Sequence, residues 1–276
     1  MSAERPATPT LVDASGVAFT TGRTPQRIVS LVPSLTETLC HLGLADALVG
    51  VTVYCREPAD VVRTKRRIGG EKDPDLDAIR ALAPDLVVTN VEENVRAHVE
   101  TLRAAGIAVW VTYPRTVRDG IAMIRDLGRV TATESRADAL ADELDRLYES
   151  VTTRSAGIAS ARVFYAIWRE PYMTVNADTY IHDMLRVCGA ANVFGDHAER
   201  YPTVSLDEMA ARQPEVIVLP DEPFRFRAAH IADFHAYPTM PAVRAGRIHL
   251  VDGKPFSWHG PRIREALQTL PALFAR

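Results

Sequence analysis

The sequence predicts an α/β protein of two Rossmann-like lobes with mainly parallel sheets, joined by one long backbone helix. Strand patterns alternate with helical patterns in both halves, a short segment recurs in each half, and a long amphipathic stretch separates them. With 276 residues, 47% of them hydrophobic, the chain can form two cores. We predict a lead and hairpin over 1–24, a first lobe over 25–131, a connecting helix over 132–158 and a second lobe over 159–276.

The first 25 residues are expected to add little to either core. Residues 1–10 combine prolines with polar side chains, which predicts a disordered lead. Val12–Phe19 and the Thr-Gly-Arg-Thr-Pro stretch at 21–25 together predict a small hairpin that ends at Pro25.

The first core strand is predicted over Arg27–Val32, an apolar run that precedes a helical pattern. Ser34 and Glu37 have the spacing of a capping box, so we expect them to satisfy free N–H groups at the start of the next helix. Gly43 is placed to end that helix. Further strands are predicted at Ala47–Val53, Leu86–Thr89, Ala108–Val111, Arg162–Trp168, Val216–Leu219 and Arg247–Val251.

The stretch between the halves has one apolar face. It consists of Leu140, Leu144, Leu147, Tyr148 and Val151, and charged residues fall on the other faces. At about 1.5 Å per residue this helix is more than roughly 30 Å long. We therefore expect a rigid connection between the lobes.

A helix, a proline and a buried strand recur at one spacing. Leu76-Asp77 precedes Pro84 and the apolar run 86–88, and Leu206-Asp207 precedes Pro214 and the run 216–218 at the same interval. This repeat indicates two related lobes.

Composition and motifs exclude several classes of protein. A net charge of -3 predicts no nucleic-acid partner and no cationic membrane face. Cys40, Cys55 and Cys188 form neither a disulfide framework nor a metal motif. The usual catalytic and metal-binding motifs are missing, so we predict no catalytic residue and no metal site. No export signal is readable in the first twenty residues, which favours the cytoplasm or a form without its export segment.

Polar and aromatic residues follow the predicted strands. In open α/β sheets ligands bind outside the carboxyl ends of the strands, so these residues are the candidate ligand contacts. Aromatic faces with a few fixed charges suit a flat or bulky ligand. The basic run at 63–67 is interpreted as a solvated edge, and Cys55 as a loop thiol. The candidate ligand-binding residues are Tyr54, Arg56, Glu92, Asn94, Trp168, Arg169, Tyr172, Glu222, Phe224, Lys254, Trp258 and His259.

Three parts of the chain carry a family resemblance. They are Arg27-Ile-Val-Ser-Leu-Val-Pro-Ser-Leu-Thr-Glu37, Leu82-Ala-Pro-Asp-Leu-Val-Val88, and 187–194 with the following Val204-Ser-Leu-Asp-Glu208. In combination they resemble the periplasmic cobalamin- and siderophore-binding proteins of ABC importers, also called helical-backbone metal receptors. The resemblance runs from about Val12 to the C-terminus.

The resemblance implies a function and a partner. It implies a metal chelate, such as a corrinoid, haem or ferric siderophore, held between the lobes, and a monomer outside the cytoplasmic membrane with no built-in cofactor. It also implies that Asp77 and Asp207 dock onto an ABC permease with its ATPase, although cobalamin members usually carry glutamate there. Gly69-Gly70 and Asn90 stand where those members tend to place aromatic residues, so the ligand stays open.

Other functions stay open at this point. The same cleft could serve a cytosolic chelate-binding protein, a chaperone, a sensor or an enzyme. An enzyme would use Glu92, His259 or Cys55 as acid, base or ligand. Arg169, Lys254 and Arg262 are expected to meet carboxylates or phosphate of the bound chelate.

Overall fold

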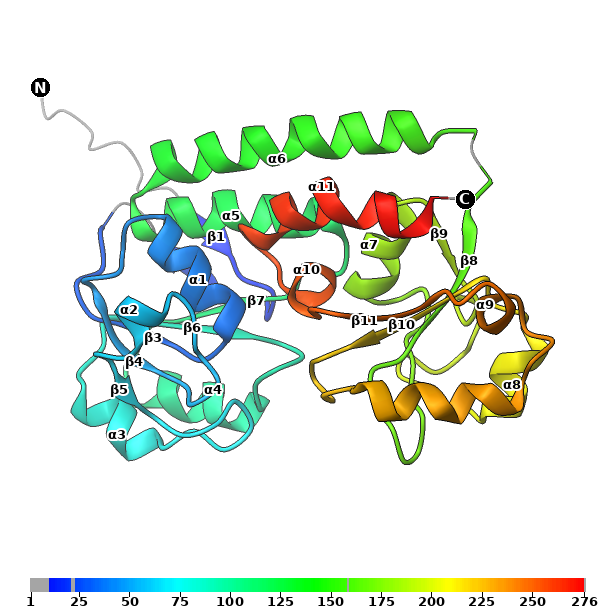
Figure 1. Cartoon of the computed structure of the whole chain (residues 1–276). Helices are drawn as coiled ribbons and strands as arrows, with labels where there is room; N and C mark the ends of the chain where they lie inside the picture. Colours follow the sequence, from blue (N-terminus) through cyan, green and yellow to red (C-terminus); the bar gives the residue numbers. More distant parts are fainter. Residues whose placement is uncertain (1–9, 21–22, 158, 276) are drawn as a thin grey trace, which may run out of the picture. The chain divides into compact units, whose positions relative to one another are not determined.

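The computed structural model describes residues 10–20, 23–157 and 159–275, which form two compact units (Figure 1). The first unit runs to Pro114 and adds 118–143 and 259–261, and the second holds 115–117, 144–258 and the C-terminal segment from Arg262. Most of the predicted lead lies outside the described residues. Each unit has its own parallel sheet, which confirms the predicted fold class.

The sheet of the first unit has five parallel strands in the order β5-β4-β3-β6-β7. Figure 1 shows α3 and α4 on one side of it and α1 and α5 on the other. Val29 of β3 and Val87 of β6 pack with Ile79 of α3 and Leu102 of α4 in a buried core. The elements are β3 (Ile28–Ser30), α1 (Pro33–His41), β4 (Leu48–Val51), α2 (Ala59–Val62), β5 (Arg66–Arg67), α3 (Leu76–Ala81), β6 (Leu86–Asn90), α4 (Arg96–Ala104), β7 (Val109–Thr112) and α5 (Val117–Thr131).

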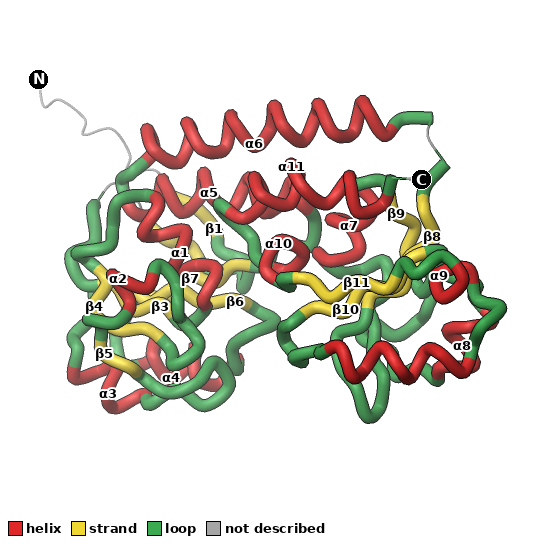
Figure 2. The backbone as a smooth tube through the Cα atoms, viewed as in Figure 1, coloured by secondary structure: helices red, strands yellow, loops and turns green. Residues whose placement is uncertain are grey.

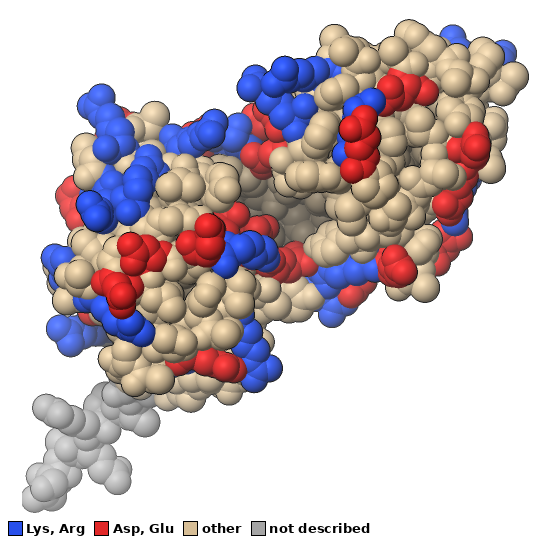
Figure 3. Space-filling model, turned by 90° about the horizontal axis from the view of Figure 1, so that it is seen from below, with Lys and Arg blue, Asp and Glu red and all other residues tan. Residues whose placement is uncertain are grey.

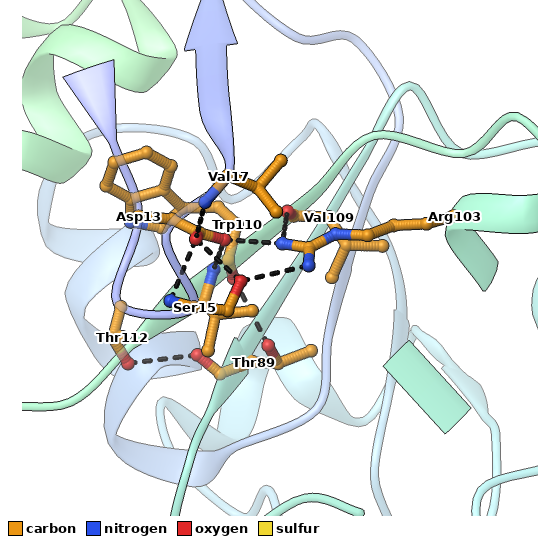
Figure 4. Close-up of polar contacts among 9 residues, drawn as sticks. Asp13, Ser15, Val17, Thr89, Arg103, Val109, Trp110 and Thr112 are labelled. Atoms are coloured by element: carbon orange, nitrogen blue, oxygen red, sulfur yellow. Dashed lines mark hydrogen bonds and ion pairs between the residues drawn. The ribbon is translucent and has the colours of Figure 1, made fainter. Parts of the chain in front are cut away.

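A hairpin is present, formed by the antiparallel strands β1 (Thr10–Val12) and β2 (Ala18–Thr20), but its turn lies inside the predicted stretch Val12–Phe19, and residues 21 and 22 lie outside the described residues. Asp13 anchors it to the first unit, as Figure 4 shows. The buried Asp13 carboxylate accepts hydrogen bonds from the backbone N–H groups of Val17 and Val111, at 3.0 and 3.1 Å. It also lies 2.5 Å from Nη2 of Arg103. The hairpin is therefore tied to both α4 and β7.

The sheet of the second unit has four parallel strands in the order β11-β10-β8-β9 (Figure 2). Ile217 and Leu219 of β10 pack with Met209 and Phe234 in the core on one side of this sheet. The elements are β8 (Ala161–Tyr165), α7 (Tyr180–Val187), β9 (Ala190–Asn192), α8 (Leu206–Ala211), β10 (Val216–Pro220), the 3₁₀ helix η1 (Ala228–Ala236), α9 (Pro241–Arg244), β11 (Ile248–Val251), α10 (Lys254–Ser257) and α11 (Arg262–Phe274).

The long helix α6 (Glu134–Ser155) has 22 residues; it begins in the first unit and ends in the second. Leu140, Leu144, Tyr148 and Val151 are buried, as the apolar stripe predicts, whereas Leu147 of the same stripe is only half-buried. None of the described helices has the length and apolarity needed to cross a membrane.

The repeat has the same local structure in both units. Asp75 caps α3 by accepting a hydrogen bond from the N–H of Ala78, and Ser205 caps α8 in the same way through Glu208. Each helix then ends two residues before a left-handed residue, Ala83 (φ 45°) or Gln213 (φ 47°), and each of these precedes the repeat's proline. A buried five-residue strand follows each proline, β6 in one unit and β10 in the other.

The predicted capping box at Ser34 and Glu37 is wrong. Helix α1 starts at Pro33, its N-cap is Val32, and no side chain caps it. Proline lacks an N–H group and has a fixed φ, so it suits the first helical position, and Ser34 is then buried inside the helix. Gly43 follows the helix with φ 84°, as predicted for a C-terminal glycine.

Two strands were not predicted, and several predicted strands are too long: those over Arg27–Val32 and Ala47–Val53 end at Ser30 and Val51. β5 and β9 are edge strands of two and three residues, which give no alternating pattern to read. The strand predicted over Arg162–Trp168 ends at Tyr165, so Trp168 lies in the following loop. On the face drawn in Figure 3, acidic and basic side chains are interspersed over each unit.

Candidate ligand-binding site

The loop after β4 holds Tyr54 at the carboxyl edge of the first sheet. The Tyr54 side chain is 56% exposed. Behind it, the guanidinium of Arg67 donates to the carbonyl oxygens of Thr52 and Cys55, at 2.8 and 2.6 Å. The Cys55 Sγ lies 3.1 Å from the Thr36 hydroxyl. These contacts fix the backbone of the loop. Because they do not involve the Tyr54 ring, the ring is available to a ligand.

The loop after β6 lies at the same edge of the sheet and is organised by Asn94. The Asn94 carboxamide accepts from the N–H of Asn90 at 2.9 Å and donates to the carbonyls of Leu31 and Glu71, at 3.2 and 3.1 Å. Asn94 is 8% exposed. It therefore holds three chain segments together, and its predicted contact with a ligand stays a prediction.

Glu92 and its neighbour Glu93 are both partly buried in this loop. Lys72 donates to the carbonyl oxygen of Glu92. Burial raises the pKa of Glu93, and the charge of Lys72 opposes that shift. The Lys72 ammonium therefore contacts this loop through the Glu92 carbonyl, and its charge acts on the Glu93 carboxylate.

Apolar side chains are exposed at the same edge of the first sheet. Val53 is 48% exposed and Val91 is 44% exposed, next in sequence to Tyr54 and Glu92 respectively. Exposed aliphatic and aromatic groups beside a few polar ones are typical of small-molecule sites. Neither valine was predicted as a ligand contact, because both continue the apolar pattern of the preceding strand.

The loop after β8 carries three predicted residues of the second unit. Trp168 is 43% exposed, whereas Tyr172 is 8% exposed. Arg169 pairs with Asp233, its Nε lying 2.7 Å from Oδ2, and the hydroxyl of Tyr172 donates to the same oxygen at 2.7 Å. Asp233 has no signal in the sequence, because it lies 64 residues from Arg169.

Aromatic rings join this loop to the one after β10. The ring of Phe224 meets Trp168 edge-on, with centroids 5.5 Å apart, and lies 4.8 Å from the ring of Phe226. Phe226 in turn stacks on Tyr172 at 6.2 Å. The result is an aromatic cluster at the carboxyl edge of the second sheet.

Glu222 and Trp258 form a second group at this edge. Burial raises the pKa of Glu222, against the charge of Lys254 and a hydrogen bond with Trp258. Lys254 Nζ lies 6.0 Å and Arg262 Cζ lies 5.9 Å from the centroid of the Trp258 ring. An added Cβ at Gly253 would lie 2.7 Å from Glu222 Cγ, so this glycine permits the close approach.

Lys254 and Arg262 are already engaged by carboxylates. Lys254 lies 3.2 Å from Asp252, and Arg262 lies 2.9 Å from Glu265. A chelate carboxylate at either cation would therefore compete with an internal partner.

Two predicted residues of the first unit complete the set, Arg56 in the loop of Tyr54 and His259 near the C-terminal end of the chain. Arg56 is exposed in the first unit, one residue after Cys55. His259 belongs to the first unit and is 7% exposed, and burial lowers its pKa to about 4. Its imidazole is therefore neutral at neutral pH.

The predicted docking acids occupy matching positions. Asp77 and Asp207 are the second residues of α3 and α8, and both are exposed. Each already has an internal partner. Arg80 pairs with Asp77 at 2.7 Å, and the hydroxyl of Tyr237 donates to Asp207 at 2.6 Å.

Two α/β units, each with aromatic and charged side chains at the carboxyl edge of a parallel sheet, define the class of two-lobed solute-binding proteins. Among the described residues no group of three metal-ligating side chains comes together. Residues 28–255 match the family model described as periplasmic binding protein, and the chain belongs to that family. The resemblance drawn from the sequence is thereby confirmed.

Named relatives refine this placement. The chain is 26% identical over 192 residues to a vitamin B12-binding protein of Vibrio cholerae, covering 70% of this chain and 69% of the relative. It is also 26% identical over 250 residues to a vitamin B12-binding protein of Pectobacterium carotovorum, covering 89% and 87%.

Solved structures share the fold. The periplasmic vitamin B12-binding protein of Vibrio cholerae aligns with a TM-score of 0.81 at 23% identity, covering 91% of this chain and 97% of that one. A periplasmic haem-binding protein of a Roseiflexus species aligns with a TM-score of 0.81 at 22% identity, covering 92% and 98%. At these identities the likeness establishes the fold.

Proposed function

We propose that this protein is the solute-binding protein of an ABC importer, and that it binds a metal chelate: a corrinoid, haem or a ferric siderophore. The observation that carries the proposal is the set of exposed aromatic side chains at the carboxyl edges of the sheets. Tyr54 in the first unit and Trp168 in the second are both held there by buried or half-buried polar contacts. Aromatic faces match the flat apolar surface of a macrocyclic chelate.

The cations beside these rings suit the chelate's periphery. Corrinoids and haem carry phosphate, amide or carboxylate groups around an apolar plane. Arg169, Lys254 and Arg262 lie at the same edge of the second sheet as Trp168 and Trp258. The vitamin B12 and haem named for the relatives support the same class of ligand.

The chelate would be transported cargo, with no cofactor built into the protein, and we propose that the protein does not catalyse a reaction. Burial raises the pKa of the Cys55 thiol, which makes it a poor nucleophile. Family membership supports an extracytoplasmic location, and we expect a monomer.

Spectral titration of the purified protein tests the choice of ligand. Cyanocobalamin, haemin and two ferric siderophores would be titrated separately, with the metal salts alone as controls. We expect saturable binding of one chelate class at micromolar concentrations and none of the free metal ions. If no chelate binds, the proposed function is wrong.

Docking to a permease is tested by removing both acids. The pair Asp77→Ala and Asp207→Ala should leave chelate affinity unchanged and reduce uptake into vesicles that contain the permease and its ATPase. The matched control is Glu100→Ala with Asp196→Ala, which removes one exposed carboxylate from each unit. Uptake equal to wild type in the first variant would exclude a docking role for Asp77 and Asp207.

A further inference from the structure

Asp233 connects η1 to the loop after β8 at two points. Its carboxylate accepts from Nε of Arg169 at 2.7 Å, from Nη2 at 3.4 Å, and from the hydroxyl of Tyr172 at 2.7 Å. The side chains of Arg169 and Asp233 are 24% and 23% exposed. The pair therefore lies partly shielded from water, where a charge-assisted hydrogen bond is stronger than at a fully exposed position.

The loop that Asp233 holds is a short hairpin. Trp168 and Met173 form its base, with the N–H of Met173 donating to the carbonyl of Trp168 at 3.1 Å. Between them Glu170 has φ 65°, a left-handed conformation that an L-residue keeps only when its surroundings impose it. Arg169 and Tyr172 flank this position, so Asp233 secures the loop on both sides of it.

Aromatic side chains of η1 also pack against the loop after β8. The Tyr172 ring meets Phe234 of η1 edge-on, with centroids 5.8 Å apart. His230, also on η1, lies 5.5 Å from the ring of Phe224. The 3₁₀ helix therefore supports both aromatic loops of the second unit, and Asp233 provides its polar contact.

Trp168 lies at the base of the loop that Asp233 holds. Its indole is 43% exposed and has an edge-on contact with Phe224. The backbone of its neighbour Arg169 leads directly into the part of the loop that Asp233 holds. A side chain that is ordered before the ligand arrives loses less conformational freedom on binding, which increases affinity.

We propose that Asp233 is a positioning residue of the ligand-binding site: it fixes the loop after β8 so that Trp168 is ordered in the ligand-free protein. This inference rests on the proposed function, because Trp168 is a predicted ligand contact. Asp233 itself would not touch the ligand. The pair joins one loop to a 3₁₀ helix near the surface and is still partly exposed, so its loss should change the order of the loop and leave the unit folded.

The test uses the full-length protein labelled with 5-fluorotryptophan, with the Trp168 resonance assigned by Trp168→Phe. In Asp233→Asn we expect the ligand-free Trp168 signal to broaden or shift and the melting temperature to stay that of wild type. The affinity for whichever of cyanocobalamin, haemin and the two ferric siderophores binds wild type should fall by about 3- to 10-fold. Tyr172→Phe, which removes one of the two contacts, should act in the same direction with a smaller effect.

Asp196→Asn is the matched control. It removes a second arginine–carboxylate pair of the second unit, Arg212 with Asp196 at 2.6 Å, from the loop after β9. It should change neither the Trp168 signal nor the affinity. If Asp233→Asn also changes neither, the inference is overturned while the proposed function stands. If none of the four chelates binds wild type, the proposed function fails, and the fluorine spectrum alone decides whether Asp233 positions Trp168.

Discussion

Single carboxylates with several donors hold the first unit together, and Asp13 is the best example. Its two oxygens receive three backbone N–H groups, the Ser15 hydroxyl and the Arg103 guanidinium. The Asp13 side chain is 1% exposed. The sequence indicated a hairpin here but gave no sign of this anchor, because Arg103 is 90 residues away.

Asp13→Asn should destabilise the protein. An amide removes the charge that pairs with Arg103 and replaces one acceptor oxygen with a donor, which leaves buried N–H groups without a good partner. We expect a loss of about 2–4 kcal/mol in the free energy of unfolding, measured by urea denaturation. Asp77→Asn, at an ion-paired side chain that is 91% exposed, should cost less than about 0.5 kcal/mol. Equal effects in the two variants would contradict the role of Asp13.

His259 should make stability depend on pH. Burial lowers its pKa in the folded state to about 4, below its ordinary value of 6.5, so the unfolded chain binds the proton more readily. The stabilisation that comes from burying the neutral imidazole is therefore fully present above pH 6.5. It is lost as the pH falls through that value toward 4. Between those limits the loss should approach about 3 kcal/mol in unfolding free energy.

Replacing the imidazole tests this. His259→Gln should flatten the stability profile between pH 4 and 6.5. His235→Gln, at an exposed position, should leave the profile of the wild type. An unchanged slope in His259→Gln would show that other groups cause the acid sensitivity.

At the scale of elements, the repeat was the most informative sequence pattern. The Leu-Asp pair, the proline and the apolar run predicted α3 with β6 and α8 with β10, and the structure confirms both. The short edge strands were not predicted, because two or three residues show no periodic pattern. The start of α1 was placed wrongly, because the helix begins at Pro33 and has no side-chain cap.

The left-handed residues of the repeat predict a stabilising change. Ala83 and Gln213 have positive φ without being glycine, which costs about 1 kcal/mol each. Ala83→Gly and Gln213→Gly should each raise the unfolding free energy by about 0.5 kcal/mol after the entropy cost of glycine is subtracted.

The reverse substitution is the control. Gly106 has φ 79°, and an added Cβ there would meet no atom within 4 Å, so Gly106→Ala tests backbone strain alone. It should destabilise by about 1 kcal/mol. A stabilising Gly106→Ala, or destabilising glycines at 83 and 213, would contradict this explanation.

For the whole molecule, the sequence predicted two α/β units and the family, because apolar periodicity and the alternation of strand and helix patterns can be read from short stretches of sequence. It placed the candidate residues at the strand ends for the same reason. It did not separate residues that face solvent, such as Tyr54 and Trp168, from Asn94 and His259, which are buried. That distinction depends on contacts between distant segments, as does the role of Asp233.

Whether the exposed aromatic side chains at the strand ends bind the chelate is tested most directly by titrating two variants, Trp168→Ala and Tyr201→Ala. Trp168 and Tyr201 are similarly exposed, at 43% and 39%, but only Trp168 belongs to the aromatic cluster at the strand ends. We predict that Trp168→Ala weakens binding of the chelate that wild type binds by about tenfold or more, whereas Tyr201→Ala binds it like wild type. Wild-type affinity in Trp168→Ala would contradict the account.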